Sequence, residues 1–161
     1  MGKKKKKSPG EDSNIICKNR RAFHNYQIGE RMEAGLVLQG TEVKSCREGR
    51  AHLNDAYVQV VGEEAFLVGA HIHEYAQANR FNHEPIRTRK LLLHRKEIEK
   101  LAIRINERGY TVVPLSLYFK NGYVKAEIAL ARGQSHEDRR ERIKERDANR
   151  EIERTMKRGR R

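Results

Sequence analysis

A chain of 161 residues is long enough for one domain of ordinary size with tails. Its formal net charge of +13 at pH 7 favours a polyanionic partner. Its two cysteines, Cys17 and Cys46, exclude a disulfide framework and are not spaced as metal ligands, and no apolar run approaches the length of a membrane span. We therefore expect reduced thiols in a cytoplasmic protein with no membrane partner.

The positive charge is concentrated at the two ends of the chain. Residues 1–21 carry eight Lys or Arg against two acids, and residues 132–161 carry twelve against seven, so their net charges are +6 and +5. This distribution favours a compact domain with arms that follow a polyanion, although a lysine tag and a solvated tail are the alternative. We expect a disordered basic arm over 1–14, a folded domain over 15–131 and a basic tail over 132–161.

Strand signals dominate the start of the folded domain. The short apolar run 15–17 predicts a first strand, and the polar run 19–24 predicts a turn or strand edge. A longer strand over 26–38 is the element around which the domain is expected to be arranged. Its apolar residues alternate and share one sheet face: Met32, Ala34, Leu36 and Leu38.

A short helix is predicted directly after this strand. Thr41 would cap its first turn, and Gly49 suits the left-handed position after its last turn. Val43 and Cys46 lie three residues apart and would plug the core. A basic stripe on another face would point outward and suit phosphates; it consists of Lys44 and Arg47.

The middle of the chain predicts a hairpin, a loop and a helix. Strands 57–61 and 64–72 are joined by Gly62-Glu63, which fits a two-residue turn with glycine first. Residues 73–87 show no periodicity and predict a loop. One long helix is predicted over 88–108, where apolar residues follow one face and charges the other.

A second hairpin is predicted at Asn121-Gly122, a strong signal for a two-residue turn. Pro114 lacks a backbone donor and indicates a sheet edge or bulge at the far end of this hairpin. One face is apolar in every cross-strand pair and the other is polar, which predicts one buried and one solvated face. The apolar pairs are Phe119–Val124, Leu117–Ala126, Leu115–Ile128 and Val113–Leu130, and the polar-face pairs are Tyr118–Lys125 and Ser116–Glu127.

Together these segments predict a mainly β fold, a small antiparallel barrel that is closed or nearly closed, with a short plug helix and one longer helix. From Gly133 onward the apolar stripe that a helix needs for packing is missing. Oppositely charged pairs recur at helical spacing but contribute only ~0.2–0.5 kcal/mol each. We expect a tail that is disordered when free and helical when docked. Its cations suit phosphates: Arg139, Arg140, Arg142, Lys144, Arg146 and Arg150.

No arrangement of residues in the sequence predicts catalysis. There is no P-loop, paired-cysteine motif or helical zinc signature, so we expect no catalytic residue, no metal ligand and no cofactor. His71 and His73 would share one strand face, but without a cysteine or a placed carboxylate nearby we interpret them as surface or loop histidines. A metal-dependent nuclease is the least favoured alternative.

A mixed polar surface is expected near the strand ends and the short helix. Glu33 and Gln39 would be unusual in a purely electrostatic patch, and their oxygens suit 2′-hydroxyls or base edges of structured RNA. The neighbouring groups are Asn19, Arg20, His24, Lys44, Arg47 and Arg50. A general OB-type binder of single strands, or a ribosome-associated factor, is the runner-up. Only 6% of the residues are aromatic and none is tryptophan, which disfavours a stacking row.

Four long segments carry a family resemblance: EAGLVLQGTEVKSCREG (33–49), RTRKLLLHRKEI (87–98), GYTVVPLSLYFKNGYVK (109–125) and LARGQSHEDRRERIKERD (130–147). They resemble the sequence motifs of the SsrA-binding protein family, SmpB, and occur in the same order as in the family. The resemblance implies an OB-like barrel that binds the transfer-RNA-like domain of transfer-messenger RNA and delivers this RNA to stalled ribosomes. It also implies that the tail enters the decoding centre of the small subunit and the empty message channel. We expect a monomer.

The resemblance also implies particular contacts. His94 stands where the family often has asparagine, and Gln134 and Ser135 replace the family's usual lysines. Positions matching RNA contacts are Asn19, His24, Glu33, Glu42, Lys44, Arg47, Leu92 and His94, and the matching tail positions are Gly133, Asp138, Arg139 and Arg140.

Overall fold

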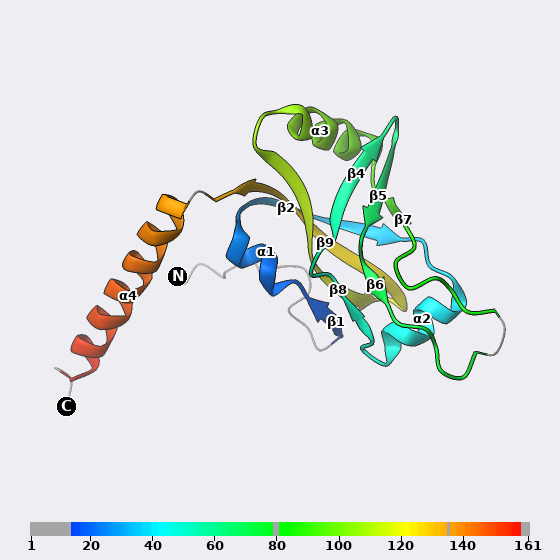
Figure 1. Cartoon of the computed structure of the whole chain (residues 1–161), viewed down its shortest axis with the longest axis horizontal. Helices are drawn as coiled ribbons and strands as arrows, with labels where there is room; N and C mark the ends of the chain where they lie inside the picture. Colours follow the sequence, from blue (N-terminus) through cyan, green and yellow to red (C-terminus); the bar gives the residue numbers. More distant parts are fainter. Residues whose placement is uncertain (1–13, 79–80, 135, 159–161) are drawn as a thin grey trace, which may run out of the picture.

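The computed structural model of the chain describes residues 14–78, 81–134 and 136–158. All but the last residue of the basic arm expected over 1–14 therefore lies outside the described residues. Within these ranges the chain is mainly β, as predicted, with helices at four places (Figure 1). The elements are β1 (Ile15–Lys18), α1 (Arg20–Asn25), β2 (Tyr26–Leu36), α2 (Gly40–Arg47), β3 (Ala51–His52), β4 (Tyr57–Val61), β5 (Glu64–Val68), β6 (His71–Ile72), β7 (Arg89–Leu92), α3 (Arg95–Asn106), β8 (Tyr110–Lys120), β9 (Tyr123–Gly133) and α4 (His136–Arg158).

The larger sheet closes on itself. Its strands are bonded in the order β1-β8-β4-β5-β7-β2-β9, and β8 also pairs with β9, so six strands form a ring to which β1 is added. All of these pairings are antiparallel. The prediction of a small antiparallel barrel is confirmed, and closure removes exposed sheet edges. A separate ribbon of β3 and β6 lies beside α2 (Figure 1).

Two apolar clusters hold the barrel together. The larger one fills the barrel, where Leu67, Leu91 and Ile128 are almost fully buried. Helix α3 covers one opening and buries Ile98 and Leu101 from its apolar face in this cluster. The smaller cluster lies between α1 and the β8–β9 hairpin and consists of Ala22, Val113, Leu115, Ala129 and Ala131.

The turn of the β8–β9 hairpin lies at Asn121-Gly122, as predicted. Both residues have positive φ, 52° and 78°, which is the conformation that this dipeptide favours. The register next to the turn is confirmed in four predicted pairs: Phe119–Val124, Leu117–Ala126, Tyr118–Lys125 and Ser116–Glu127.

A bulge changes the far half of this hairpin. The bulge falls between Pro114 and Ser116, so Ile128 pairs with Pro114. The predicted pair Leu115–Ile128 is therefore wrong. The bulge turns Leu115 toward the smaller cluster, which α1 covers. The predicted solvated face is therefore also wrong, because Ser116 and Glu127 are each only 6% exposed.

Three other local predictions are wrong. Residues 20–25 form helix α1 instead of a turn or strand edge, because Asn19 caps the helix. Strand β5 ends at Val68, because Gly69 adopts a φ of +79° and a side chain there would meet Asp55 O at 2.9 Å. The long helix predicted over 88–108 is strand β7 followed by the shorter helix α3.

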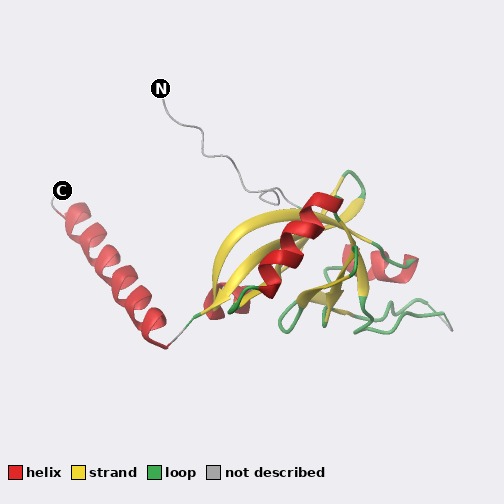
Figure 2. Cartoon of the chain, turned by 90° about the horizontal axis from the view of Figure 1, so that it is seen from above, coloured by secondary structure: helices red, strands yellow, loops and turns green. Residues whose placement is uncertain are grey.

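The tail begins slightly later than predicted and is helical. Strand β9 continues to Gly133, and α4 then runs away from the barrel (Figures 1 and 2). Its large apolar side chains Ile143, Ile152 and Met156 are exposed, which agrees with the missing apolar stripe. Among the described helices, none is both long and apolar enough to cross a membrane.

Candidate nucleic-acid interface

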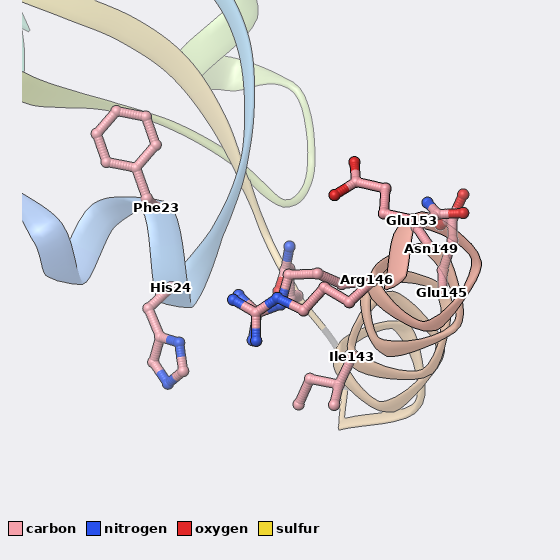
Figure 3. Close-up of a pocket in the computed structure, with 9 residues that line it drawn as sticks. Phe23, His24, Ile143, Glu145, Arg146, Asn149 and Glu153 are labelled. Carbon is pink, nitrogen blue, oxygen red and sulfur yellow. The ribbon is translucent and has the colours of Figure 1, made fainter. Parts of the chain in front are cut away.

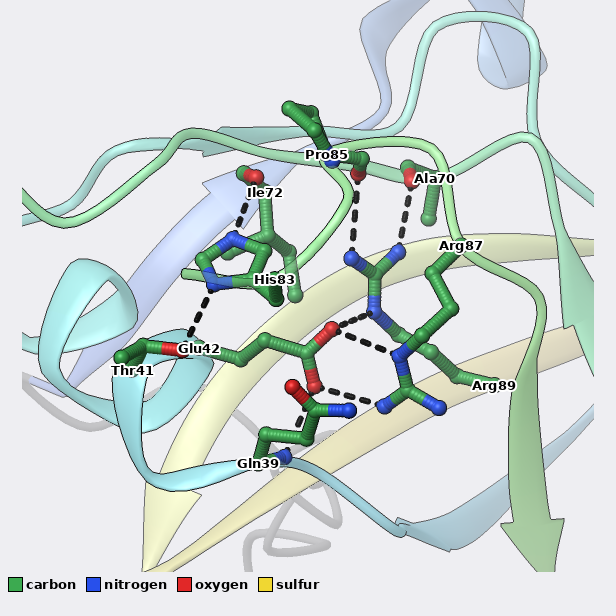
Figure 4. A network of polar contacts seen from close by, with 9 residues as sticks. All are labelled: Gln39, Thr41, Glu42, Ala70, Ile72, His83, Pro85, Arg87 and Arg89. Atoms are coloured by element: carbon green, nitrogen blue, oxygen red, sulfur yellow. Dashed lines mark hydrogen bonds and ion pairs between the residues drawn. The ribbon is translucent and has the colours of Figure 1, made fainter. Parts of the chain in front are cut away.

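A buried carboxylate anchors the short helix α2. Glu42 is fully buried and accepts hydrogen bonds from Arg89 Nε at 2.8 Å and from Arg87 Nη2 at 2.8 Å (Figure 4). The remaining guanidinium donors of Arg89 bind Ala70 O at 2.7 Å and Pro85 O at 3.0 Å. This network ties α2 to β7 and to the loop before it.

The charge of Glu42 is stabilised by these partners. Burial alone would raise the pKa of Glu42, but hydrogen bonds from Arg87 and the Gln39 amide and the positive charge of Arg89 hold it below its ordinary value. The backbone N–H of Gln39 donates to Glu42 Oε2 at 2.8 Å, so the carboxylate also satisfies the backbone donor at the start of α2.

The N-terminus of α2 differs from the prediction in one respect. Gln39, and not Thr41, is the N-cap residue. The Thr41 hydroxyl lies 2.9 Å from His83 Nδ1, and His83 Nε2 lies 2.9 Å from Ile72 O. A carbonyl only accepts, so Nε2 carries the proton and, in the neutral ring, Nδ1 accepts from Thr41. The helix start is thus tied to the loop over 73–88.

The outward face of α2 is basic, as predicted. Lys44 and Arg47 are exposed while Cys46 is 1% exposed and packs in the core. Val43 is only partly buried and lies outside both clusters, so its predicted part in the plug is wrong. Lys44 Nζ lies 5.5 Å from the centroid of the Tyr75 ring, a cation–π contact that positions the ammonium group.

Two residues expected to contact RNA are buried. Glu42 is 0% exposed and Asn19 is 2% exposed, so a direct contact does not fit the structure of either. Asn19 accepts from Ala22 N at 3.2 Å and donates to Pro114 O at 2.9 Å, which fixes α1 on β8. Instead, Asn19 caps α1, which carries the exposed Arg20 and His24, and Glu42 anchors α2, which carries the basic stripe.

Glu33 and Leu92 lie apart from the α2 residues, in a second region that contains predicted RNA contacts. This region is a groove between β2, β7 and the start of α3. Tyr118 donates its hydroxyl hydrogen to Glu33, and Lys120 Nζ lies 3.2 Å from the same carboxylate. Burial alone would raise the pKa of Glu33, but these bonds lower it. Tyr118 is only 3% exposed and is not available for stacking on bases. The groove is lined further by Lys90, Leu92, His94 and Lys125.

Leu92 is the apolar part of this groove. It is 55% exposed on strand β7, whereas its neighbour Leu91 is 1% exposed and belongs to the barrel core. Gly35 on β2 makes room for Leu92, because an added Cβ there would come within 3.1 Å of Leu92 Cβ. Gln39, the N-cap residue of α2, is exposed three residues after the end of β2.

The third region that contains predicted site residues is a cleft between α1 and the tail helix α4. Figure 3 shows Phe23 and His24 on one side and Ile143 and Arg146 on the other. Among the tail cations predicted to meet phosphates, those whose side chains the structure describes are exposed: Arg140, Lys144, Arg146 and Arg150. The side chains of Asp138, Arg139 and Arg142 lie outside the described part, although their backbone belongs to α4.

The predicted site residues thus fall into three separate regions and not into one patch. The sequence reasoning missed Arg87, Arg89 and His83, which hold α2 in place. The first two lie in a segment that carries the family resemblance, but Arg87 was predicted at the end of the loop over 73–87 and Arg89 in the helix over 88–108. Their spacing on alternate residues before an apolar run is the signal for a strand with one buried face.

A closed antiparallel barrel with a basic helix at one end and a basic helical tail defines the class of small RNA-binding barrel proteins. Within that class the chain belongs to the SmpB family, since the family model described as "SmpB protein" matches residues 16–158. It is accordingly not an enzyme.

Curated relatives agree with this assignment. The SsrA-binding protein of Geobacillus kaustophilus is 52% identical over 149 residues, covering 92% of this chain and 96% of the relative. The SsrA-binding protein of Geobacter sulfurreducens is 53% identical over 143 residues, covering 89% and 94%. A solved structure described as "tmRNA-SmpB: a journey to the center of the bacterial ribosome" has a TM-score of 0.66 and 38% identity, covering 81% of this chain and 95% of that chain.

Proposed function

We propose that this protein is an RNA-binding adaptor of trans-translation, which binds the transfer-RNA-like domain of transfer-messenger RNA and delivers it to stalled ribosomes in the cytoplasm. The observation that carries the proposal is the identity of about half of the chain with proteins named for binding the SsrA RNA, over nearly their whole length. The solved relative is described together with transfer-messenger RNA and the ribosome.

The barrel supplies the RNA-binding surface. Lys44 and Arg47 on α2 meet backbone phosphates, and the buried Glu42 network keeps their helix rigid. The groove around Glu33 and Leu92 combines a carboxylate acceptor with an apolar contact, which suits the ribose and base edges of folded RNA. Arg20, His24, Gln39 and His94 extend this polar surface along the barrel.

The tail has a separate role. Its exposed cations lie on a helix that projects from the barrel, an arrangement suited to a polyanionic groove. That groove is the decoding centre and the message channel of the small subunit, which is empty only when a ribosome has stalled. The tail therefore acts as the sensor of an empty channel, and Gly133, Asp138, Arg139 and Arg140 belong to its first part.

A gel-shift titration with the isolated transfer-RNA-like domain tests the barrel surface. Lys44→Glu with Arg47→Glu should weaken binding strongly and lower the slope of log affinity against log salt by about one per lost phosphate contact. The control is Arg104→Glu with Arg108→Glu, which reverses two exposed charges in and just after the last turn of α3, the helix at the top of Figure 1, whereas α2 lies at the lower right. Equal affinity of the α2 variant and the wild type would show that the assigned face is wrong.

The same titration distinguishes the runner-up function. An adaptor for folded RNA prefers an elbow-containing RNA to an unstructured strand of equal length at near-physiological salt. A general binder of single strands would hold both equally well, because stacking platforms do not read RNA shape.

A further inference from the structure

Three histidines, two of them two residues apart in the sequence, meet at the β3–β6 ribbon. His52 of β3 and His71 of β6 are direct cross-strand partners. His73 lies two residues beyond His71, so its side chain returns to the same face. The His73 amide donates to Arg50 O at 3.0 Å, which continues the ribbon past the end of β6.

The three imidazoles are close to one another. The His52 and His71 rings are stacked with centroids 4.6 Å apart, and the His73 ring meets His71 edge-on at 4.5 Å. One nitrogen of each residue can be chosen so that all three lie within 4.8 Å of one another. His71 Nδ1 is buried and has no hydrogen-bond partner among the described residues, and a buried polar atom without a partner needs an explanation.

We propose that His52, His71 and His73 bind a divalent transition-metal ion of the Zn²⁺ class. Imidazole nitrogens favour Zn²⁺, Ni²⁺ or Cu²⁺ over Mg²⁺ or Ca²⁺, which prefer oxygen ligands. In a tetrahedral site with zinc–nitrogen bonds near 2.1 Å the nitrogens lie roughly 3.4 Å apart. Small side-chain rotations would bring nitrogens that lie within 4.8 Å of one another to this separation, and the exposed His52 side chain has room to rotate.

The ion would stabilise the segment that holds α2 in place. It would join β3 to β6 and to the first residue of the 73–88 loop. That loop carries Tyr75, whose ring lies under Lys44, and His83, which bonds Thr41 at the start of α2. Three protein ligands leave a fourth position for water. The role is structural and is additional to the proposed RNA binding.

The site is tested with metal alone, on the untagged full chain freed of RNA and treated with a chelator. Titration with Co²⁺ should give the visible absorption of a low-symmetry nitrogen site, saturating at one equivalent, and Zn²⁺ should displace it. His71→Gln and His52→Gln should each weaken binding by more than the roughly 10–100-fold that loss of a supporting residue causes.

The matched control is His94→Asn, because it removes an exposed imidazole elsewhere and asparagine still suits the N-cap of α3. This variant should bind Co²⁺ and Zn²⁺ as tightly as the wild type does. Circular dichroism tests whether each variant is folded. His52→Gln changes an exposed side chain, so this variant removes a ligand and leaves the core intact. A wild type that takes up neither metal, or ligand variants that bind as tightly as the wild type, would overturn the proposal.

Discussion

Glu42 on α2 and Arg89 on β7 form an ion pair in which neither side chain is exposed to solvent, with Arg89 Nε 2.8 Å from Glu42 Oε1. The two residues are 47 positions apart in the sequence. Their pairing fixes the helix that carries the basic stripe to the wall of the barrel. The proposed RNA-binding face is therefore held by a buried charge pair and not by apolar packing alone.

Removing one partner of this pair should strongly destabilise the fold. Glu42→Gln leaves the buried Arg89 charge uncompensated, and breaking such a pair typically reduces the free energy of unfolding by about 3–5 kcal/mol. Urea unfolding at neutral pH measures the loss. The comparison is Glu63→Gln, which breaks the exposed Arg95–Glu63 pair and should change stability by less than about 1 kcal/mol. Similar effects of the two substitutions would contradict the structural role of Glu42.

The same pair predicts an acid dependence. The pKa of Glu42 in the folded protein lies below its ordinary value of 4.5, so the unfolded chain binds the proton more readily. The stabilisation is present above pH 4.5 and is lost as the pH falls through the lower, folded-state pKa. The difference in unfolding free energy between the wild type and Glu42→Gln should therefore shrink as the pH falls below 4.5. A difference that stays constant down to pH 3 would argue against an ionised Glu42.

Leu91 and Leu92 should separate stability from binding. Leu91→Ala removes a side chain that is 1% exposed in the core and should reduce the free energy of unfolding by about 2–5 kcal/mol. Leu92→Ala, at a residue 55% exposed, should change stability by less than about 0.5 kcal/mol yet weaken RNA binding. Thermal unfolding and gel shifts on both variants test this, and unchanged RNA affinity of Leu92→Ala would remove the groove from the interface.

Truncation after Gly133 should separate the two proposed roles of the chain. The barrel is complete at this point, since β9 ends there, so binding to the transfer-RNA-like domain should persist. Tagging of a stalled nascent chain in a translation assay should be abolished, because the tail cations are missing. Normal tagging by the truncated protein would exclude the sensor role.

A peptide spanning 134–161 tests how the tail folds. Exposed charge pairs alone give a marginal helix in water, so circular dichroism should show little helix in the free peptide. A stably helical free peptide would contradict folding on docking, while leaving the sensor role open to the truncation test.

Local signals predicted part of this fold. The Asn121-Gly122 turn and the register beside it depend on adjacent residues, and both are confirmed. The segment 88–108 was mistaken for one helix because Leu91, Ile98 and Leu101 also fit a helical face, and only the pairing of β7 with β5 and β2 separates strand from helix. Such pairings are long-range, and the only local signal for β7 is a short alternation that begins at Arg87 and Arg89.

The site was predicted less completely for the same reason. The outward direction of Lys44 and Arg47 follows from helical spacing and is confirmed. The burial of Glu42 depends on Arg87 and Arg89, which approach it only in the folded barrel. Similarly, His71 and His73 are visible as a pair in the sequence, whereas His52 joins them only through the β3–β6 pairing.

The proposed function requires that this protein bind transfer-messenger RNA in the cell. The direct measurement is purification of the affinity-tagged full chain from its own host, followed by sequencing of the RNA that accompanies it. Transfer-messenger RNA should be the most enriched species, and Lys44→Glu with Arg47→Glu should greatly reduce its recovery. Absence of this RNA above the untagged control, or equal recovery with the double variant, would contradict the proposed function.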